Sequence, residues 1–170
     1  MNNPSLPRTL YSLLLAVGIG QWIHYYPRLP LQMASHFGHN GTANNWQSRD
    51  HFFLLMFGAI LLATAVNFVI PRILSKLPSE QISLPNKSYW LAPERREETF
   101  RFISTQMGWF ACGLLGVLLY ATSQTIHANL PGGRFNNQRM TFALIALLLL
   151  VAVWLIRFVR HFYQTAPGQP

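Results

Sequence analysis

Charged residues, and acidic ones above all, are scarce in this chain. Its 170 residues include 5 Asp and Glu, and 11% of the chain is charged, where a soluble domain has about 25%. Four segments contain no Asp, Glu, Lys or Arg: 10–26, 52–70, 107–126 and 140–156. Ion pumps and proton relays need ionisable side chains at membrane depth. Their absence from these segments disfavours ion or proton transport.

Cysteine is nearly absent as well. The single Cys112 excludes an intrachain disulfide, and a thiol inside an apolar segment behaves as a small apolar side chain. The sequence also lacks a nucleophile elbow and a phosphate-binding glycine-rich loop. We therefore expect no enzymatic activity and no cofactor.

The four uncharged segments are each about long enough to cross a bilayer. A hydrocarbon core of roughly 30 Å needs about 20 helical residues, and a helix satisfies its own backbone hydrogen bonds in lipid. The pattern predicts an all-α integral membrane protein, a four-helix bundle that forms a single domain over residues 1–170. The expected transmembrane helices cover about 10–26, 52–70, 105–126 and 140–160, and Pro71 is expected to end the second.

The basic residues predict an orientation. Most of the 13 Lys and Arg lie in the two tails and in the 72–100 loop with its C-terminal flank. The positive-inside rule then places both termini and this loop in the cytoplasm, and loop 28–50 outside. Anionic lipids on the cytoplasmic side are the expected partners of this charge. We do not expect nucleic acid as a partner, because a nucleic-acid-binding protein clusters its positive charge on a soluble face.

The outer loop 28–50 is rich in Asn, Gly and His. Asn40 and Gly41 predict a turn, since both residue types tolerate a positive φ. Residues 31–37 suit either a short strand or an interfacial helical turn. His36 and His39 are weak candidates for a metal site, because zinc usually combines His with Cys or carboxylate ligands. Histidines that hydrogen-bond near lipid headgroups are the alternative, so we expect no metal.

Small residues recur at a spacing of four on two of the expected helices. Such stripes let helix backbones approach closely in lipid, so we expect helix packing at these positions. They are Gly108, Cys112 and Gly116 on the third helix and Ala59 and Ala63 on the second.

The segment before the third span predicts the start of a helix. Pro93 suits the first helical position, and Glu94 suits the first turn. We expect this helix to run directly into the third span. The segment either docks a cytoplasmic partner or is a solvated helix start.

Two stretches resemble a known family. The first resembles the outer-loop pattern of that family. The matching residues are Leu29, Pro30, His36, Phe37, Gly41, Asn44, Trp46 and Ser48, and Arg49 stands where the family has Lys. The departures from the pattern are Gly38, Ala43 and Asn45. The second resembles a cytoplasmic motif and comprises Tyr89, Trp90, Leu91, Ala92, Pro93, Glu94, Arg95 and Arg96. The family is a bacterial membrane domain of unknown function that also forms the N-terminal part of SdpI-like bacteriocin immunity proteins. The resemblance implies a helical bundle in a bacterial inner (plasma) membrane and protection against a secreted toxin.

The leading functional hypothesis is a non-enzymatic membrane protein whose outer loop recognises an extracytoplasmic peptide or protein. The expected contact residues are Trp46 and Phe37 as apolar anchors, with His36, Asn40, Gly41 and Asn44. For Trp46, an interfacial belt position is the alternative. Two other classes stay open: an oligomeric transporter or membrane-enzyme accessory subunit, in which the small-residue stripes would join copies of the chain, and an outer-face histidine metal site.

Overall fold

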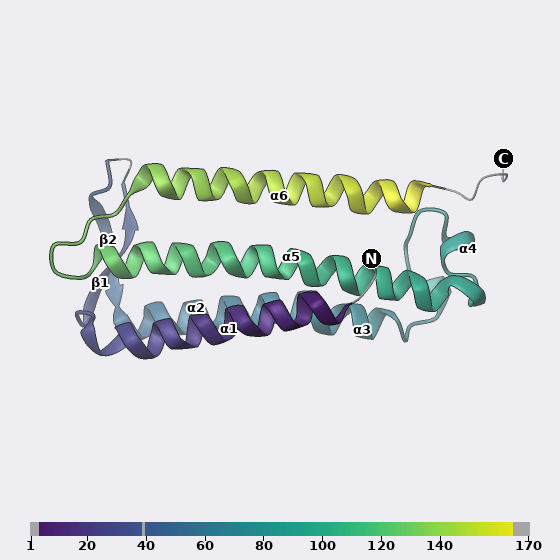
Figure 1. The fold of residues 1–170 in the computed structure, drawn as a ribbon, viewed down its shortest axis with the longest axis horizontal. Coiled ribbons are helices and arrows are strands. Elements are labelled where there is room, and N and C mark those ends of the chain that lie inside the picture. Colours follow the sequence, from purple (N-terminus) through teal and green to yellow (C-terminus); the bar gives the residue numbers. More distant parts are fainter. Residues whose placement is uncertain (1–3, 39, 165–170) are drawn as a thin grey trace.

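The computed structural model describes residues 4–38 and 40–164. Four long helices lie side by side along its long axis (Figure 1), and they are α1 (Ser5–Tyr25), α2 (Arg49–Thr64), α5 (Pro93–Ala128) and α6 (Asn137–Tyr163). A hairpin of β1 (Gln32–Phe37) and β2 (Ala43–Ser48) lies at one end. The short elements are η1 (Tyr26–Arg28), η2 (Ala65–Val69), α3 (Ile70–Leu74), η3 (Ser79–Gln81) and α4 (Lys87–Trp90).

Among the described residues, three helical segments are long and apolar enough to cross a membrane: Arg49–Leu74, Pro93–Ala128 and Asn137–Tyr163. They correspond to the second, third and fourth predicted spans and extend beyond the predicted bounds at both ends. The first predicted span, α1, is not among them. Its 21 residues include Arg8 near the start and Gln21 and His24 near the end. The membrane character of the chain therefore rests on three helices.

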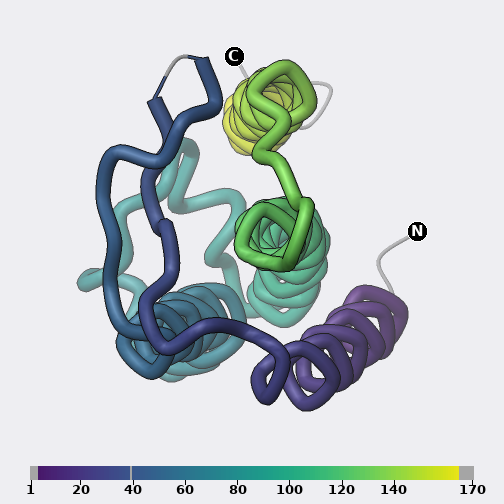
Figure 2. Tube along the Cα trace, turned by 90° about the vertical axis from the view of Figure 1, so that its left-hand side faces the viewer, coloured from purple at the N-terminus to yellow at the C-terminus, as the bar shows by residue number. Residues whose placement is uncertain are grey.

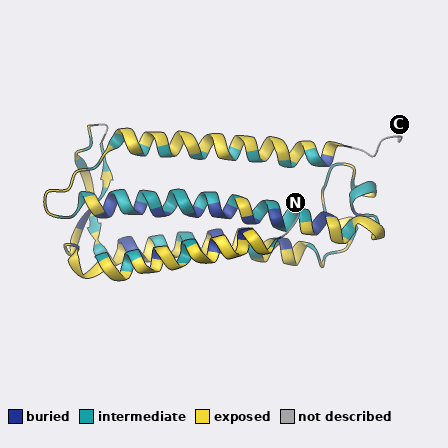
Figure 3. Ribbon diagram, in the orientation of Figure 1, coloured by how far each residue is buried: buried dark blue, intermediate teal, exposed yellow. Residues whose placement is uncertain are grey.

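α5 is the central helix and contacts α1, α2 and α6. Its inward face is buried, whereas α6 is largely exposed (Figure 3). One buried cluster joins α1 to α5 through Tyr11, Ala111, Cys112, Leu115 and Leu119. Apolar side chains exposed on α2 and α6 suit contact with lipid, because a bilayer replaces the protein interior as the apolar environment.

Small residues allow α1 and α5 to approach closely. A Cβ added at Gly108 would lie 3.1 Å from the Pro7 ring, and the Cys112 Sγ donates to the Pro7 carbonyl at 3.2 Å. The stripe on α5 thus faces α1 at these two positions. Gly116 has open space around its Cβ position. On α2, Ala63 is buried and Ala59 is half-buried.

The second helix continues past Pro71, where the sequence predicted its end. The five residues of η2 form a π-helical turn, in which the Ile70 amide donates to the Ala65 carbonyl. Proline in an α-helix clashes with the carbonyl four residues earlier and removes a donor. The wider turn directly before Pro71 spaces these groups differently, so α3 continues the rod to Leu74.

The all-α expectation is wrong in one place, because loop 28–50 contains the antiparallel pair β1–β2. Its register pairs Gln32 with Ser48 and Ala34 with Trp46, and a bulge follows Ala34. The predicted turn is present: the Gly41 amide donates to the Gly38 carbonyl at 2.9 Å. Gly41 has φ +78°, a conformation that favours glycine. Viewed from this end, the hairpin extends from α1 and α2 toward α6 (Figure 2).

The start of α5 agrees with the prediction. Ala92 is the N-cap, Pro93 is the first helical residue, and Glu94 lies in the first turn. The helix runs without interruption through the third predicted span to Ala128. The cytoplasmic loop predicted over 72–100 is therefore shorter, and ends where α5 begins.

The α1–α5 contact gives a stability prediction. Gly108→Leu places a side chain against the Pro7 ring, and overpacking of this kind costs about 1–3 kcal/mol. Thermal unfolding in detergent micelles should show a midpoint lowered by several degrees. Gly116→Leu is the matched control on the same helix and should leave the midpoint nearly unchanged. Equal losses in the two variants would contradict the packing described for α1 and α5.

Candidate recognition site at the hairpin end

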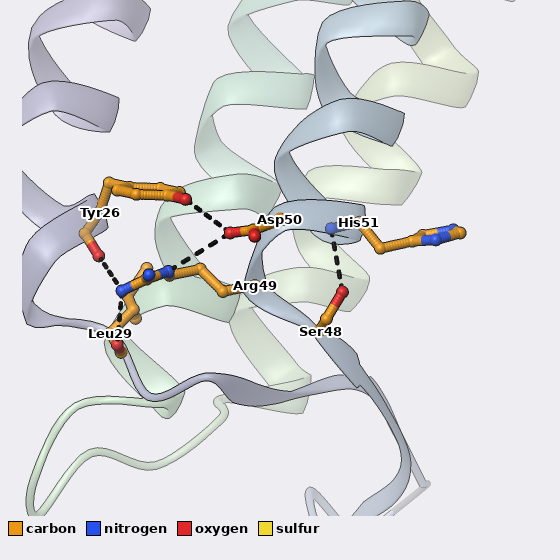
Figure 4. A network of polar contacts seen from close by, with 6 residues as sticks. All are labelled: Tyr26, Leu29, Ser48, Arg49, Asp50 and His51. Atoms are coloured by element: carbon orange, nitrogen blue, oxygen red, sulfur yellow. Dashed lines mark hydrogen bonds and ion pairs between the residues drawn. The ribbon is translucent and has the colours of Figure 1, made fainter.

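Arg49 holds the two ends of the outer loop together (Figure 4). Its Nη1 donates to the carbonyls of Tyr26 at 3.0 Å and Leu29 at 3.2 Å. Its guanidinium carbon lies 4.1 Å from the centre of the Tyr26 ring, a cation–π contact. The side chain is 17% exposed, so most of it is packed into this junction. Arg49 therefore fixes where the chain leaves α1 relative to where it enters α2.

Two further contacts order the start of α2. The Ser48 hydroxyl accepts from the His51 amide at 3.2 Å and caps the helix. The Tyr26 hydroxyl donates to Asp50 Oδ1 at 2.5 Å, and this hydrogen bond raises the pKa of Tyr26 above its usual value. Asp50 also lies 3.7 Å from Arg49 Nε, an ion pair. One carboxylate thus links η1 to the first turn of α2.

Asparagine side chains attach the hairpin to α5 and α6. Asn129 Oδ1 accepts from the Ala34 amide at 2.7 Å, and its Nδ2 donates to the Ala34 carbonyl at 2.9 Å. The side chain thereby pairs with the outer edge of β1 as a neighbouring strand would. Asn137 Nδ2 donates to the Gly38 carbonyl at 2.8 Å. The hairpin is therefore held from α2, from the end of α5 and from the start of α6.

A pocket of about 410 Å³ lies between the hairpin and the start of α6. The Phe37 and Phe135 rings stack beside it, with centroids 4.0 Å apart and planes 6° from parallel. Its lining mixes aromatic, aliphatic, hydroxyl and amide groups with one histidine, so it offers a ligand both apolar surface and hydrogen-bonding groups. The lining residues are Ser35, His36, Phe37, Gly38, Thr125, Phe135, Asn137, Met140, Thr141 and Leu144.

The structure brings some of the predicted contact residues to this pocket and not others. His36 and Phe37 line it. Asn40 instead shapes the turn, where its Oδ1 accepts from the Thr42 amide and hydroxyl at 3.2 and 2.6 Å. Gly41 lies in the same turn. Asn44 and Trp46 are exposed on β2, Trp46 to 57%, and neither lines the pocket.

The histidines give no metal centre in the part of the chain that the structure describes. No group of three or more His, Cys, Asp or Glu with metal-binding geometry is found within residues 4–38 and 40–164. His36 Nδ1 lies 3.2 Å from the Ser35 hydroxyl. His39, the other candidate, falls outside the described residues.

The second predicted motif lies at the opposite end and joins helices of the same chain. Trp90 Nε1 donates to the Phe162 carbonyl at 3.0 Å, and Arg95 stacks 3.9 Å from the Tyr89 ring centre. Arg96 Nη1 donates to the Ser79 hydroxyl at 2.7 Å. Pro93 and Glu94 form the first turn of α5. The motif therefore attaches the end of α6 and the α3–α4 connection to the start of α5.

Three residues that line the pocket or hold its hairpin wall were not predicted as site residues: Phe135 and Asn137 line it, and Asn129 holds β1. All three lie near the ends of apolar helices and are distant in sequence from the loop that they contact. Asn129 and Ala34, for example, are 95 residues apart. The signal that was available is the Asn136–Asn137 pair before the fourth apolar segment, since Asn favours helix N-caps. Asn136 does cap α6 by accepting from the Arg139 amide at 2.9 Å.

Residues 13–65 match the family model described as Domain of unknown function (DUF1648). The match covers most of α1, the hairpin and all of α2. The matched segment includes Arg49 and the hairpin wall of the pocket, whereas α5 and α6 lie outside it. Neither a curated protein nor a solved structure gives a significant match to the chain.

Substitution of Arg49 should loosen the hairpin. Arg49→Lys keeps the charge but loses the planar fork that reaches two carbonyls and stacks on Tyr26, at a cost of about 1–3 kcal/mol. Hydrogen exchange followed by mass spectrometry should show β1 and β2 amides exchanging about tenfold faster or more. The middle of α5 should be unchanged.

Arg134→Lys is the control, because Arg134 is exposed and its guanidinium has no hydrogen bond or ion pair within the described residues. Its hairpin exchange should match that of the wild type. Wild-type exchange rates in Arg49→Lys would show that the hairpin is held without this side chain.

Proposed function

We propose that this chain is a non-enzymatic membrane protein whose hairpin end recognises an extracytoplasmic peptide or protein. The observation that carries the proposal is the pocket between the hairpin and α6, whose hairpin wall is fixed by Arg49, Asn129 and Asn137. A binding wall held before the ligand arrives loses less conformational freedom on binding. Phe37 and Phe135 supply an apolar platform, and His36 with the neighbouring hydroxyl and amide groups supplies polar contacts.

In the proposed arrangement α1 is a fourth transmembrane helix. Its 21 residues span about 31 Å at 1.5 Å per residue, close to the thickness of the hydrocarbon core. It packs along α5, one of the three apolar helices. With four crossings both termini lie on one side, and the distribution of Lys and Arg favours the cytoplasm of a bacterial cell for that side.

The proposed role within this class is immunity to, or sensing of, a secreted toxin. It rests on the resemblance of the outer loop to the N-terminal part of SdpI-like immunity proteins, and the DUF1648 match falls on the same segment. The alternative of an oligomeric transporter or accessory subunit keeps only part of its support, since Gly116 has open space around its Cβ position but two other residues of the stripe are used within the chain. Gly108 and Cys112 contact Pro7 of the same chain rather than an open surface.

Survival of a deletion strain exposed to the secreted-peptide fraction of competing strains tests the proposal. Wild-type protein should restore survival. Thr141→Trp fills the pocket from α6 and should reduce protection about tenfold or more, as for loss of a central contact in an interface. Phe142→Trp adds the same side chain one residue along, outside the pocket lining, and should protect fully.

Two hairpin variants locate the contact surface. His36→Ala should weaken protection, because His36 lines the pocket, whereas Trp46→Ala should retain it. Lack of protection by wild-type protein would refute the immunity role. Equal protection by Thr141→Trp and the wild type would refute the pocket as the recognition surface.

A further inference from the structure

A second cavity lies at the end of the molecule opposite the hairpin, where α1, α3 and α5 meet. We call it the basic cavity, and its volume is about 530 Å³. It is lined by Pro4, Arg8, Pro71, Arg72, Ser75, Pro93, Arg96, Glu97, Phe100, Arg101 and Ser104. Three separate stretches of the chain thus converge on one concave surface.

The basic cavity has an excess of positive charge. Arg8, Arg72, Arg96 and Arg101 line it together with one carboxylate, Glu97. Within residues 4–38 and 40–164 the structure has a single ion pair, between Arg49 and Asp50 at the other end. Arginines gathered in one cavity repel one another, so an anion placed among them relieves that repulsion.

The four arginines divide into two roles. Arg96 and Arg72 are used in the fold: Arg96 donates to the Ser75 and Leu77 carbonyls, and Arg72 donates to the Phe68 carbonyl. The guanidinium groups of Arg8 and Arg101 have no hydrogen bond or ion pair in the described part of the chain, and both side chains are exposed. Each guanidinium presents five N–H donors. Arg8 and Arg101 are therefore the groups free to take a ligand.

The basic cavity lies at the ends of two apolar segments, the position that a headgroup layer would occupy around membrane-spanning helices. The apolar segment Arg49–Leu74 ends beside it, and the apolar segment Pro93–Ala128 begins there. Pro71 and Phe100, both buried, form its apolar wall. The N-terminus of α5 adds the positive end of a 36-residue helix dipole. An apolar wall beside several arginines suits a ligand that has both an apolar part and an anionic group.

We propose that the basic cavity binds a phosphate group through Arg8 and Arg101, with the hydroxyl of Ser104 as a further donor. Guanidinium groups pair with phosphate through two parallel hydrogen bonds, and basic pockets between membrane helices suit anionic lipid headgroups. Its place at the end of the apolar segments favours an anionic phospholipid over free phosphate as the source of the group. This site is independent of the recognition proposed for the hairpin end.

Lipid binding to the purified full-length protein tests the proposal. Native mass spectrometry in detergent would compare phosphatidylglycerol with phosphatidylcholine of the same acyl chains, and calorimetry would titrate inorganic phosphate. The double variant Arg8→Gln/Arg101→Gln should lose about tenfold or more in affinity for the preferred phosphate source. Arg157→Gln/Arg160→Gln removes the same charge at the same end, outside the basic cavity, and should lose far less.

Each outcome decides the matter. A preference for phosphatidylglycerol that is lost in the cavity variant supports the lipid source. Binding of inorganic phosphate that is lost in the cavity variant supports the site with free phosphate as its ligand. Equal losses of affinity in the two double variants, or no loss in the cavity variant, would overturn the proposed phosphate site. An unchanged circular dichroism spectrum would show that the cavity variant is folded.

Discussion

The guanidinium group of Arg49 is the contact on which the hairpin end depends. It bridges the carbonyls that follow α1, stacks on Tyr26 and pairs with Asp50 at the start of α2. The loop buries Leu29 and Met33 against Phe52, Phe53 and Ile126, and the guanidinium group, with its several donors, satisfies backbone carbonyls that this apolar packing leaves without partners. This bridge, together with Asn129 and Asn137, sets the position of the strands and hence of the pocket.

α5 plays the corresponding part for the helices. It is the element against which α1, α2 and α6 pack, and its end carries Asn129, which pairs with β1. The same helix therefore supports the apolar core, the hairpin and, at its start, the attachment of α6 through Trp90 and its neighbours. The two ends of the molecule are thus connected through one continuous helix, and the candidate site and the basic cavity share it.

The sequence predicted the elements that local chemistry determines. The uncharged apolar segments predicted the helices α2, α5 and α6, and Pro93 predicted where α5 begins. The Asn40–Gly41 pair predicted the turn between the strands. The hairpin could not be assigned, because residues 31–37 show neither clear alternation nor many β-branched residues. Its strands are ordered by contacts from residues distant in sequence, such as Asn129. Local sequence likewise pointed to His36 and Phe37, which line the pocket, but to no residue of the opposite wall, which comes from distant parts of the chain.

α6 differs from the other long helices in how it is attached. It lies against α5 along one side, Asn137 ties its first turn to the hairpin, and the Phe162 carbonyl accepts from Trp90 and Asn86 at its last turn. Its 27 residues form a rod about 40 Å long, stiff because its backbone hydrogen bonds are all internal. A ligand wedged beneath its first turn would push on a rod whose far end lies against Trp90 and Phe102, so that occupancy of the pocket would displace side chains at the opposite end of the molecule.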